Sequence, residues 1–279
     1  MQYSTLYNGV KVPMVGFGTW KPEGRDNVDA NRMAIEAGYR YFDTASYYGT
    51  EPAIGEALAG CGIAREEFFL TSKVAKYEMG YEKTLEAFQR TIENLQTDYL
   101  DLYLIHWPKD TPDNPNWKQL DLDTYRAMEE LYEAGKVRAI GFSNFLPYHL
   151  DNILEHCKVK PMVDQLEFHP GYTQEATVRY CQERDILVQA WSPMGRQRVL
   201  QDPLLLELAE KYSVTTAKIC LRYALQRGIT VLPKSSSMER MKANLDVFSF
   251  ALSDEDMKRI TSMPPTGWSG LHPDWNSGK

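Results

Sequence analysis

The sequence predicts an α/β protein built on a closed (β/α)8 or TIM barrel, with an N-terminal β-hairpin and two extra helices. Short, nearly continuous apolar runs alternate with longer amphipathic segments, which is typical of buried parallel strands connected by helices. About eight such units can be counted, and the 279 residues suit a barrel, which takes roughly 250. No linker or change in composition divides the chain, so residues 1–279 are expected to form one domain. An open doubly wound sheet is the structural alternative.

The elements are expected in the following order. The turn-forming pair Asn8-Gly9, flanked by alternating residues, predicts a two-residue hairpin. The barrel strands are expected at residues 15–19, 40–44, 68–74, 98–107, 137–143, 162–168, 186–193 and 229–234. Their helices are expected at residues 27–38, 50–61, 81–95, 122–135, 149–157, 174–185, 215–228 and 238–246. The extra helices are expected at residues 203–212 and after the capping sequence SDED at 253–256.

Residue types at the helix ends support these limits. Gly38 suits the C-terminal end of the first helix, and Thr50 is the expected N-cap of the second. In the third helix, apolar side chains recur at helical spacing and predict one buried stripe: Leu85, Phe88, Ile92 and Leu95. The loop over residues 108–120 is longer than most strand-to-helix loops, so it is a candidate wall of a binding site.

The composition argues against several classes of protein. With 43% hydrophobic and 25% charged residues, the chain resembles a globular protein rather than a disordered or membrane protein. The formal net charge of −7 argues against nucleic acid or an anionic membrane as a partner. The four cysteines lack metal-ligand spacing and the N-terminus has no signal-peptide pattern, which predicts reduced thiols in a cytoplasmic protein. We expect a monomer that acts on a small molecule.

Three apolar strands end in ionisable groups, which is the strongest chemical signal in the sequence. Asp43, Lys73 and His106 lie at or near the ends of the second, third and fourth strands, and Tyr48 lies in the loop after the second. In a barrel these ends share one face, where active sites lie. Taken singly, each has a structural explanation: a strand-end lysine, a structural ion pair, a loop-packing tyrosine and a core histidine. Together they favour an active site that reduces carbonyl groups.

Several motifs, in order and at characteristic spacing, make the chain resemble the aldo-keto reductase family over nearly its whole length. They are GFGTW, GYRYFDTASYYGTE, LTSKV, LDLYLIHWP, GKVRAIGFSNF, QLEFHP, WSP and VLPKSSSMERMKAN. The C-terminal SGLHPDW is similar to the prokaryotic branch that includes 2,5-diketo-D-gluconate reductases. The resemblance implies a TIM barrel that reduces aldehydes or ketones to alcohols with NADPH.

The resemblance also implies catalytic roles. Tyr48 would be the general acid that protonates the carbonyl oxygen, although a free phenol, with a pKa near 10, is a poor donor at neutral pH. Lys73 would lower the pKa of Tyr48, and Asp43 would keep Lys73 charged and in place. His106 would orient the substrate carbonyl.

A nicotinamide cofactor is implied by the later strands. GFGTW lacks the third glycine of a dinucleotide-binding loop, so that interpretation is poor. The positions that match contacts to the nicotinamide carboxamide, nicotinamide face and pyrophosphate are Ser143, Asn144, Gln165, Trp191 and Ser192. Those that match the segment around the 2′-phosphate and adenosine are Lys234, Ser235, Arg240 and Asn244. Alanine at position 243 replaces a glutamate common in relatives, which removes one expected adenine contact.

The substrate pocket is expected to be aromatic. Its candidate wall residues are Trp20, Tyr47 and Trp107, with His106 facing the carbonyl. In the C-terminal tail, Trp268, His272 and Trp275 are equally compatible with packing and with substrate contact. Small aldehydes, α-keto compounds and keto-sugars remain open as substrates.

Two rival functions remain. One is a non-enzymatic NADP-binding sensor, which the four intact catalytic positions disfavour. The other is a metal-dependent hydrolase using His106 and His169; five histidines without a close pair or acidic ligand run disfavour it, and we expect no metal.

Overall fold

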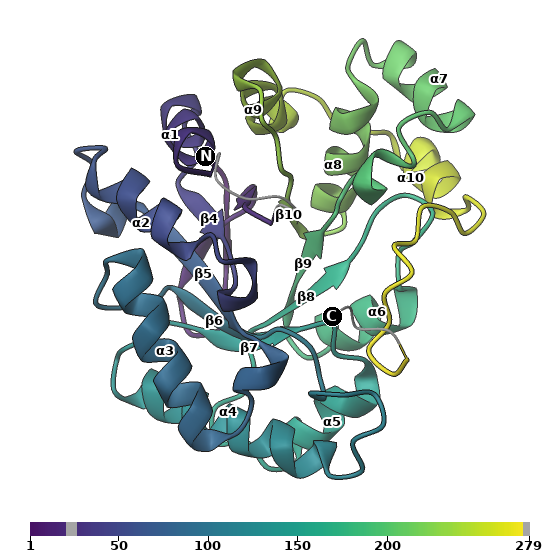
Figure 1. The fold of residues 1–279 in the computed structure, drawn as a ribbon. Helices are drawn as coiled ribbons and strands as arrows, with labels where there is room; N and C mark the ends of the chain where they lie inside the picture. Colours follow the sequence, from purple (N-terminus) through teal and green to yellow (C-terminus); the bar gives the residue numbers. More distant parts are fainter. Residues whose placement is uncertain (21–26, 276–279) are drawn as a thin grey trace.

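The computed structural model describes residues 1–20 and 27–275, in which parallel strands form a barrel ringed by helices (Figure 1). The strands are β1 (Tyr3–Thr5), β2 (Lys11–Pro13), β3 (Phe17–Gly18), β4 (Tyr41–Asp43), β5 (Phe69–Val74), β6 (Leu102–Ile105), β7 (Ile140–Ser143), β8 (Val163–Glu167), β9 (Leu187–Trp191) and β10 (Thr230–Leu232). The helices are α1 (Asn27–Ala37), α2 (Glu51–Ala59), α3 (Tyr81–Leu95), α4 (Trp117–Glu133), α5 (Pro147–Leu154), α6 (Glu175–Gln182), α7 (Pro203–Lys211), α8 (Thr216–Gln226), α9 (Met238–Leu245) and α10 (Asp254–Thr261).

The barrel is closed, so the open-sheet alternative is wrong. Strands β3 to β10 pair in chain order, each parallel to its neighbours. The first and last strands meet through a parallel bridge between Val15 and Val231 and a 2.9 Å hydrogen bond from Gly16 N to Val231 O. A Cβ on Gly16 would lie 2.6 Å from the Tyr41 ring, so the close approach at this seam requires glycine. The α7 and α10 helices are the two predicted extra helices.

Side chains alternate between the inside of the barrel and the surrounding helices, as the two-residue period of a strand requires. On β6, Leu102 and Leu104 join the inner cluster, whereas Tyr103 and Ile105 join the cluster that packs against the helices. The β1–β2 hairpin contributes Leu6 and Val12 to the inner cluster, and thereby closes the end of the barrel opposite the C-terminal strand ends.

Local details differ from two predictions near the N-terminus. The hairpin loop has three residues, Tyr7, Asn8 and Gly9, instead of the predicted two, since the hydrogen bond that closes it runs from Leu6 N to Val10 O. Only Gly9 of the three lies in the left-handed region. Thr50 precedes α2, but its hydroxyl bonds Thr19 and Thr44 rather than a helix N–H.

The N-termini of two later helices also differ in detail. The α4 helix begins at Trp117, five residues before the expected position 122, and shortens the loop after β6. At α10, Ser253 Oγ accepts from Asp256 N as predicted, while Ser253 N donates to Tyr212 Oη in place of the reciprocal bond.

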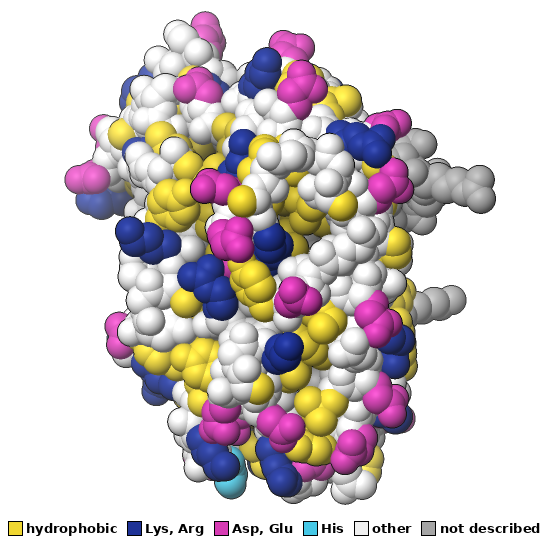
Figure 2. All heavy atoms as spheres, turned by 90° about the vertical axis from the view of Figure 1, so that its left-hand side faces the viewer, with side chains coloured by type: hydrophobic (Ala, Val, Ile, Leu, Met, Phe, Trp, Pro, Cys, Tyr) yellow, Lys and Arg dark blue, Asp and Glu magenta, His cyan; other side chains and the backbone are white. Residues whose placement is uncertain are grey.

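The outer surface is mixed in charge. Figure 2 shows acidic and basic side chains interspersed on the side of α1, α2 and α3, without a large field of one sign. Within the described residues, none of the helices is long and apolar enough to span a bilayer.

Candidate active site

The strand period brings the predicted residues to one end of the barrel interior. Tyr41 and Phe69 belong to the inner cluster, so Asp43 and Lys73, an even number of residues later, also point inward. His106 follows the inward-pointing Leu104 in the same way. The predicted meeting of these strand ends is therefore confirmed geometrically.

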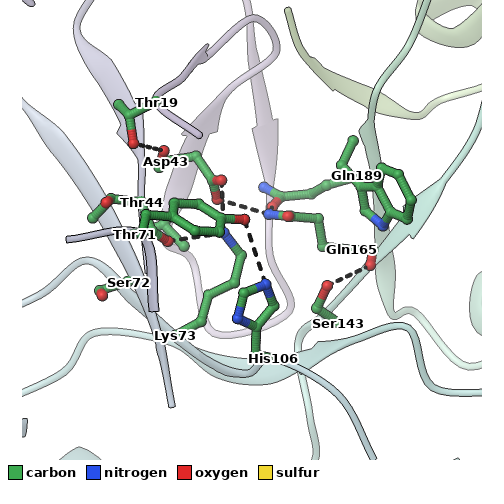
Figure 3. Close-up of polar contacts among 12 residues, drawn as sticks. Thr19, Asp43, Thr44, Thr71, Ser72, Lys73, His106, Ser143, Gln165 and Gln189 are labelled. Carbon is green, nitrogen blue, oxygen red and sulfur yellow. Dashed lines mark hydrogen bonds and ion pairs between the residues drawn. The ribbon is translucent and has the colours of Figure 1, made fainter. Parts of the chain in front are cut away.

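A buried ion pair lies at the base of the site (Figure 3). Lys73 Nζ lies 2.7 Å from Asp43 Oδ1 and also donates to Thr44 O at 2.8 Å. The second carboxylate oxygen of Asp43 accepts a 2.7 Å hydrogen bond from Gln165 Nε2. Because both charged groups are buried and hydrogen-bonded, the pair is held in one geometry.

Tyr48 lies directly over this pair. It ends a 3₁₀ turn, Ser46–Tyr48, and its ring lies 5.2 Å from Lys73 Nζ. Its hydroxyl lies 3.4 Å from His106 Nε2, a long hydrogen bond whose direction depends on the tautomer. The four predicted catalytic residues therefore form one cluster.

The pKa of Tyr48 differs from the prediction. Burial raises it well above the ordinary value for tyrosine, the Asp43 charge raises it further, and only the Arg196 charge lowers it. The charge of Lys73 does not overcome these effects, since its partner Asp43 lies 2.7 Å away. The phenol thus stays protonated. Burial and the charges of Lys73 and Lys76 also push the pKa of His106 well below its usual value, so this imidazole is neutral at pH 7.

The turn that carries Tyr48 is fixed by a second buried carboxylate, which sequence reasoning missed. Ser46 Oγ bonds both Lys73 O and Glu78 Oε2, and the same Glu78 oxygen accepts from Ala75 N at 3.0 Å. Glu78 also pairs with Arg90 at 3.2 Å. These contacts fasten the turn to the end of β5.

The residues predicted to face a nicotinamide form a linked row. Trp191 Nε1 donates to Asn144 Oδ1 at 2.8 Å, and Asn144 Nδ2 donates to Ser143 Oγ and to His106 O, both at 3.0 Å. Asn144 and Ser192 have φ of 66° and 48°, a region that non-glycine residues enter at a cost and that recurs at functional sites.

The predicted 2′-phosphate segment lies at the start of α9. Lys234 and Arg240 are exposed, and Arg240 Nε donates to Ser235 Oγ at 3.4 Å. Ser237 is the N-cap, with its hydroxyl accepting from Arg240 N. Asn244 is buried beside the Tyr39 hydroxyl and lies deeper than the two cations.

A small pocket opens beside this row. It is lined by Trp107, Asn144, Leu146, Glu167, Tyr172, Gln174, Trp191, Leu271, His272 and Pro273. Trp107 thus borders the pocket as predicted, and the Tyr47 ring lies 6.3 Å from the ring of His106. Trp20 lies at the rim of the site, where its ring is 5.2 Å from the Arg196 guanidinium.

The tail forms part of the pocket wall. His272 lines the pocket, whereas Trp268 stacks on Tyr172 and Trp275 is 67% exposed. Asp274 anchors the tail through Lys109 and Tyr148.

Three further polar side chains near the site were missed. Gln189 accepts a 3.1 Å hydrogen bond from Tyr41 Oη inside the barrel. The Glu167 carboxylate accepts hydrogen bonds from Ser269 N and Ser269 Oγ in the tail. Arg196 lies over the rings of Trp20 and Trp191. The alternation of β8 and β9 could have indicated Glu167 and Gln189, but the direction of a loop arginine has no sequence signal.

Two other observations delimit the site. A hollow on the outside of the barrel, lined by Arg32, Glu36, Arg40 and Cys61 among others, lies between α1 and α2 and contains none of the candidate residues. In the described part of the chain, no three or more His, Cys, Asp or Glu side chains are grouped so that they could hold a metal ion.

Comparisons with known proteins agree with this geometry. The model of the aldo/keto reductase family matches residues 14–264. The chain is 44% identical over 270 residues to the glyoxal reductase of Bacillus subtilis (strain 168), covering 96% of this chain and 95% of the relative. It is 37% identical over 306 residues to the NADP-dependent D-sorbitol-6-phosphate dehydrogenase of Malus domestica, covering 96% and 98%.

A solved structure gives the same result. The crystal structure of MGS-M4, an aldo-keto reductase from a Medee basin deep-sea metagenome library, matches with a TM-score of 0.91 at 39% identity, covering 97% of this chain and 98% of the other. The finer placement beside 2,5-diketo-D-gluconate reductases stays a prediction. With a family model over most of its length and a relative that is 44% identical over nearly all of it, this chain belongs to the aldo/keto reductase family of oxidoreductases.

Proposed function

We propose that this protein reduces small aldehydes or ketones to alcohols with NADPH, and that Tyr48 is the general acid. The observation that carries the proposal is the placement of the Tyr48 hydroxyl 3.4 Å from His106 Nε2 and above the Lys73–Asp43 pair. A carbonyl oxygen placed between the phenol and the imidazole would meet two hydrogen-bonding groups at the moment it gains charge.

The protonation states suit reduction. Tyr48 keeps its proton because burial raises its pKa, so the phenol can donate. His106 is neutral, and an imidazole with its proton on Nε2 can donate a hydrogen bond to the carbonyl without competing as the acid. The Lys73–Asp43 pair holds a positive group under the Tyr48 ring, which would stabilise the phenolate left after proton transfer.

The residues present fit a nicotinamide dinucleotide. Bound NADPH would supply the hydride. Ser143, Asn144 and Gln165 provide a hydroxyl and two amides on adjoining strand ends, the donors and acceptors that a carboxamide needs. The bond from Trp191 Nε1 to Asn144 fixes the indole in one orientation, which suits stacking on a flat ring.

A phosphorylated dinucleotide is favoured by charge. Lys234 and Arg240 lie at the start of α9, where helix N–H groups also attract anions. The 2′-phosphate of NADP would meet both side chains there. The Malus domestica relative is named NADP-dependent, which supports NADPH as the cofactor. The name of the Bacillus subtilis relative supports glyoxal as a first substrate to test. Four cysteines without disulfides support a cytoplasmic location.

The test is a panel of glyoxal, other aldehydes, diketones and keto-sugars with NADPH and with NADH, followed by the loss of nicotinamide absorbance. Tyr48→Phe should abolish reduction while NADPH still quenches tryptophan fluorescence with an unchanged dissociation constant. Substantial turnover by Tyr48→Phe would remove the assigned role of the phenol. A wild-type protein that binds NADPH but reduces no carbonyl would contradict the enzymatic function.

A further inference from the structure

Arg196 lies at the rim of the site, between two indole rings. It follows β9, and its guanidinium carbon is 5.2 Å from the centre of the Trp20 ring and 5.7 Å from that of Trp191. Both contacts are in the range of cation–π attraction, which holds the guanidinium in place. An aromatic ring supplies no oxygen or nitrogen acceptor above its face, so neither contact gives the guanidinium N–H groups a conventional hydrogen bond.

Arg196 has no hydrogen bond or ion pair with any described residue. The nearby Glu167 carboxylate attracts it electrostatically, but both Glu167 oxygens bind Ser269, at 2.9 and 2.6 Å. The neighbouring Arg198 is different, because it donates to Trp268 O at 2.6 Å and so braces the tail. Arg196 is therefore a positioned cation whose guanidinium N–H groups donate to none of the described residues.

The backbone of this loop is held in a costly conformation. Gly195, Arg196 and Gln197 have φ of 54°, 52° and 71°, a region that non-glycine residues enter only at a cost in stability. Gly195 packs against the buried His169 ring, where a Cβ would come within 3.3 Å, and this contact holds the turn. The conformation that directs Arg196 towards the rings therefore lowers the stability of the loop.

The cation is coupled to the chemistry. The indole of Trp191, which contacts Arg196, donates to Asn144, and Asn144 donates to His106 O. One row of hydrogen bonds therefore positions both the indole and His106. The charge of Arg196 reaches the Tyr48 phenol, since it lowers the pKa of that group against the effect of burial. An anion bound by Arg196 would therefore lie near a carbonyl held by Tyr48 and His106.

We propose that Arg196 determines substrate specificity by binding an anionic oxygen group of the carbonyl substrate, so that keto acids, aldehyde acids or phosphorylated carbonyls are preferred to neutral ones. This inference rests on the proposed function. Planar guanidinium forks match carboxylate and phosphate oxygens. The diphosphate of the dinucleotide carries the same chemistry and is the competing ligand. We favour the substrate because the guanidinium lies beside Trp20 at the substrate rim and Trp191 at the expected nicotinamide face.

The experiment compares pairs of aldehydes that differ in charge but little in size: glyoxylate with glyoxal, and 4-carboxybenzaldehyde with methyl 4-formylbenzoate. kcat/KM is measured at saturating NADPH for the wild type, Arg196→Gln and Arg196→Lys. The wild type should prefer the charged member of at least one pair. Arg196→Gln should reduce that preference about tenfold or more, as expected for a lost charge-assisted hydrogen bond, and Arg196→Lys should restore part of it. Arg179→Gln, which removes an equal charge from the exposed face of α6, should leave the preference unchanged.

Binding without turnover separates the possible failures. The dissociation constant of NADPH, measured by tryptophan fluorescence, should be equal in the wild type and Arg196→Gln. Weaker NADPH binding together with an equal loss for both members of each pair would assign Arg196 to the diphosphate and overturn the proposal. If the wild type reduces neither these aldehydes nor any carbonyl of the panel above, the proposed function fails. In that case 4-(hydroxymethyl)benzoate still tests Arg196, because equal affinity of the wild type and Arg196→Gln for this carboxylate in the presence of NADP would overturn the inference.

Discussion

Lys73 and Asp43 form a fully enclosed ion pair, in which Nζ and Oδ1 are 2.7 Å apart and the two side chains are 0% and 6% exposed. Each charge is buried only because the other is present, since an unpaired buried charge is strongly unfavourable. The pair therefore couples the fold of the barrel to the position of Tyr48.

Removing one partner should cost more than removing both. Lys73→Met and Asp43→Leu are each expected to lower the free energy of unfolding by about 3–5 kcal/mol, because each leaves an uncompensated charge. The double variant should be more stable than the sum of the two losses predicts. Urea unfolding of all four proteins measures this, and additive losses would contradict a coupled pair.

Glu78 should act on turnover through the position of Tyr48. Glu78→Ala removes the acceptor of Ser46 Oγ and Ala75 N, so the turn that carries the phenol loses its attachment to β5. We expect kcat to fall about tenfold or more, because small displacements of a catalytic group are costly, while KM for NADPH stays constant.

Matched variants test whether this effect is specific. Glu78→Gln keeps one acceptor oxygen and should recover part of kcat, and Ser46→Ala should give a smaller loss in the same direction. Glu82→Ala, an exposed residue in the first turn of α3, should leave kcat unchanged. A loss in Glu78→Ala that appears only as lower thermal stability would mean that Glu78 has no positioning role.

Asp121 should make stability depend on pH. It is fully buried, its Oδ1 accepts from Lys109 N at 3.2 Å, and its Oδ2 has no partner among the described residues. Burial raises the pKa of Asp121 to about 8. Because the unfolded chain releases this proton near pH 4 and the folded chain only near pH 8, the contribution of Asp121 to stability falls as pH rises between these values.

Asp121→Asn removes this dependence while retaining an acceptor for Lys109 N. The stability of the variant relative to the wild type should therefore increase by about 2–4 kcal/mol between pH 4.5 and 7.5 and then level off above pH 8. Denaturant unfolding at several pH values gives the difference. A difference that is constant over this range, or that shrinks as pH rises, would contradict the raised pKa.

Strand periodicity was sufficient to predict much of the fold and the centre of the site. Once Tyr41 and Phe69 are placed inside the barrel, Asp43 and Lys73 must point to the same interior, so covalent geometry alone brings them together. The pKa of Tyr48 could not be predicted in this way, because it depends on how much of the phenol the surrounding loops bury. The sequence shows that Lys73 and Asp43 are near, but not that burial outweighs the charge of Lys73 at the phenol.

Loop conformations were the least predictable part. Arg196 reaches the indoles from a turn in which Gly195 to Gln197 adopt left-handed angles and Gly195 packs close to His169, and no local sequence preference indicates this conformation. Thr50 has the residue type of an N-cap, yet two neighbouring threonines compete successfully for its hydroxyl. In both cases a tertiary contact overrides the local preference.

Arg240 should distinguish NADPH from NADH. If the 2′-phosphate lies at the start of α9, Arg240→Ala removes a charge-assisted hydrogen bond that NADH cannot form, so KM for NADPH should rise about tenfold while KM for NADH stays constant. Lys242→Ala removes the same charge from an exposed position two residues further along α9 and should leave the NADPH-to-NADH ratio of kcat/KM unchanged. If the two variants change that ratio equally, the preference reflects only the overall charge of the helix; if Arg240→Ala leaves KM for NADPH unchanged, the phosphate binds elsewhere.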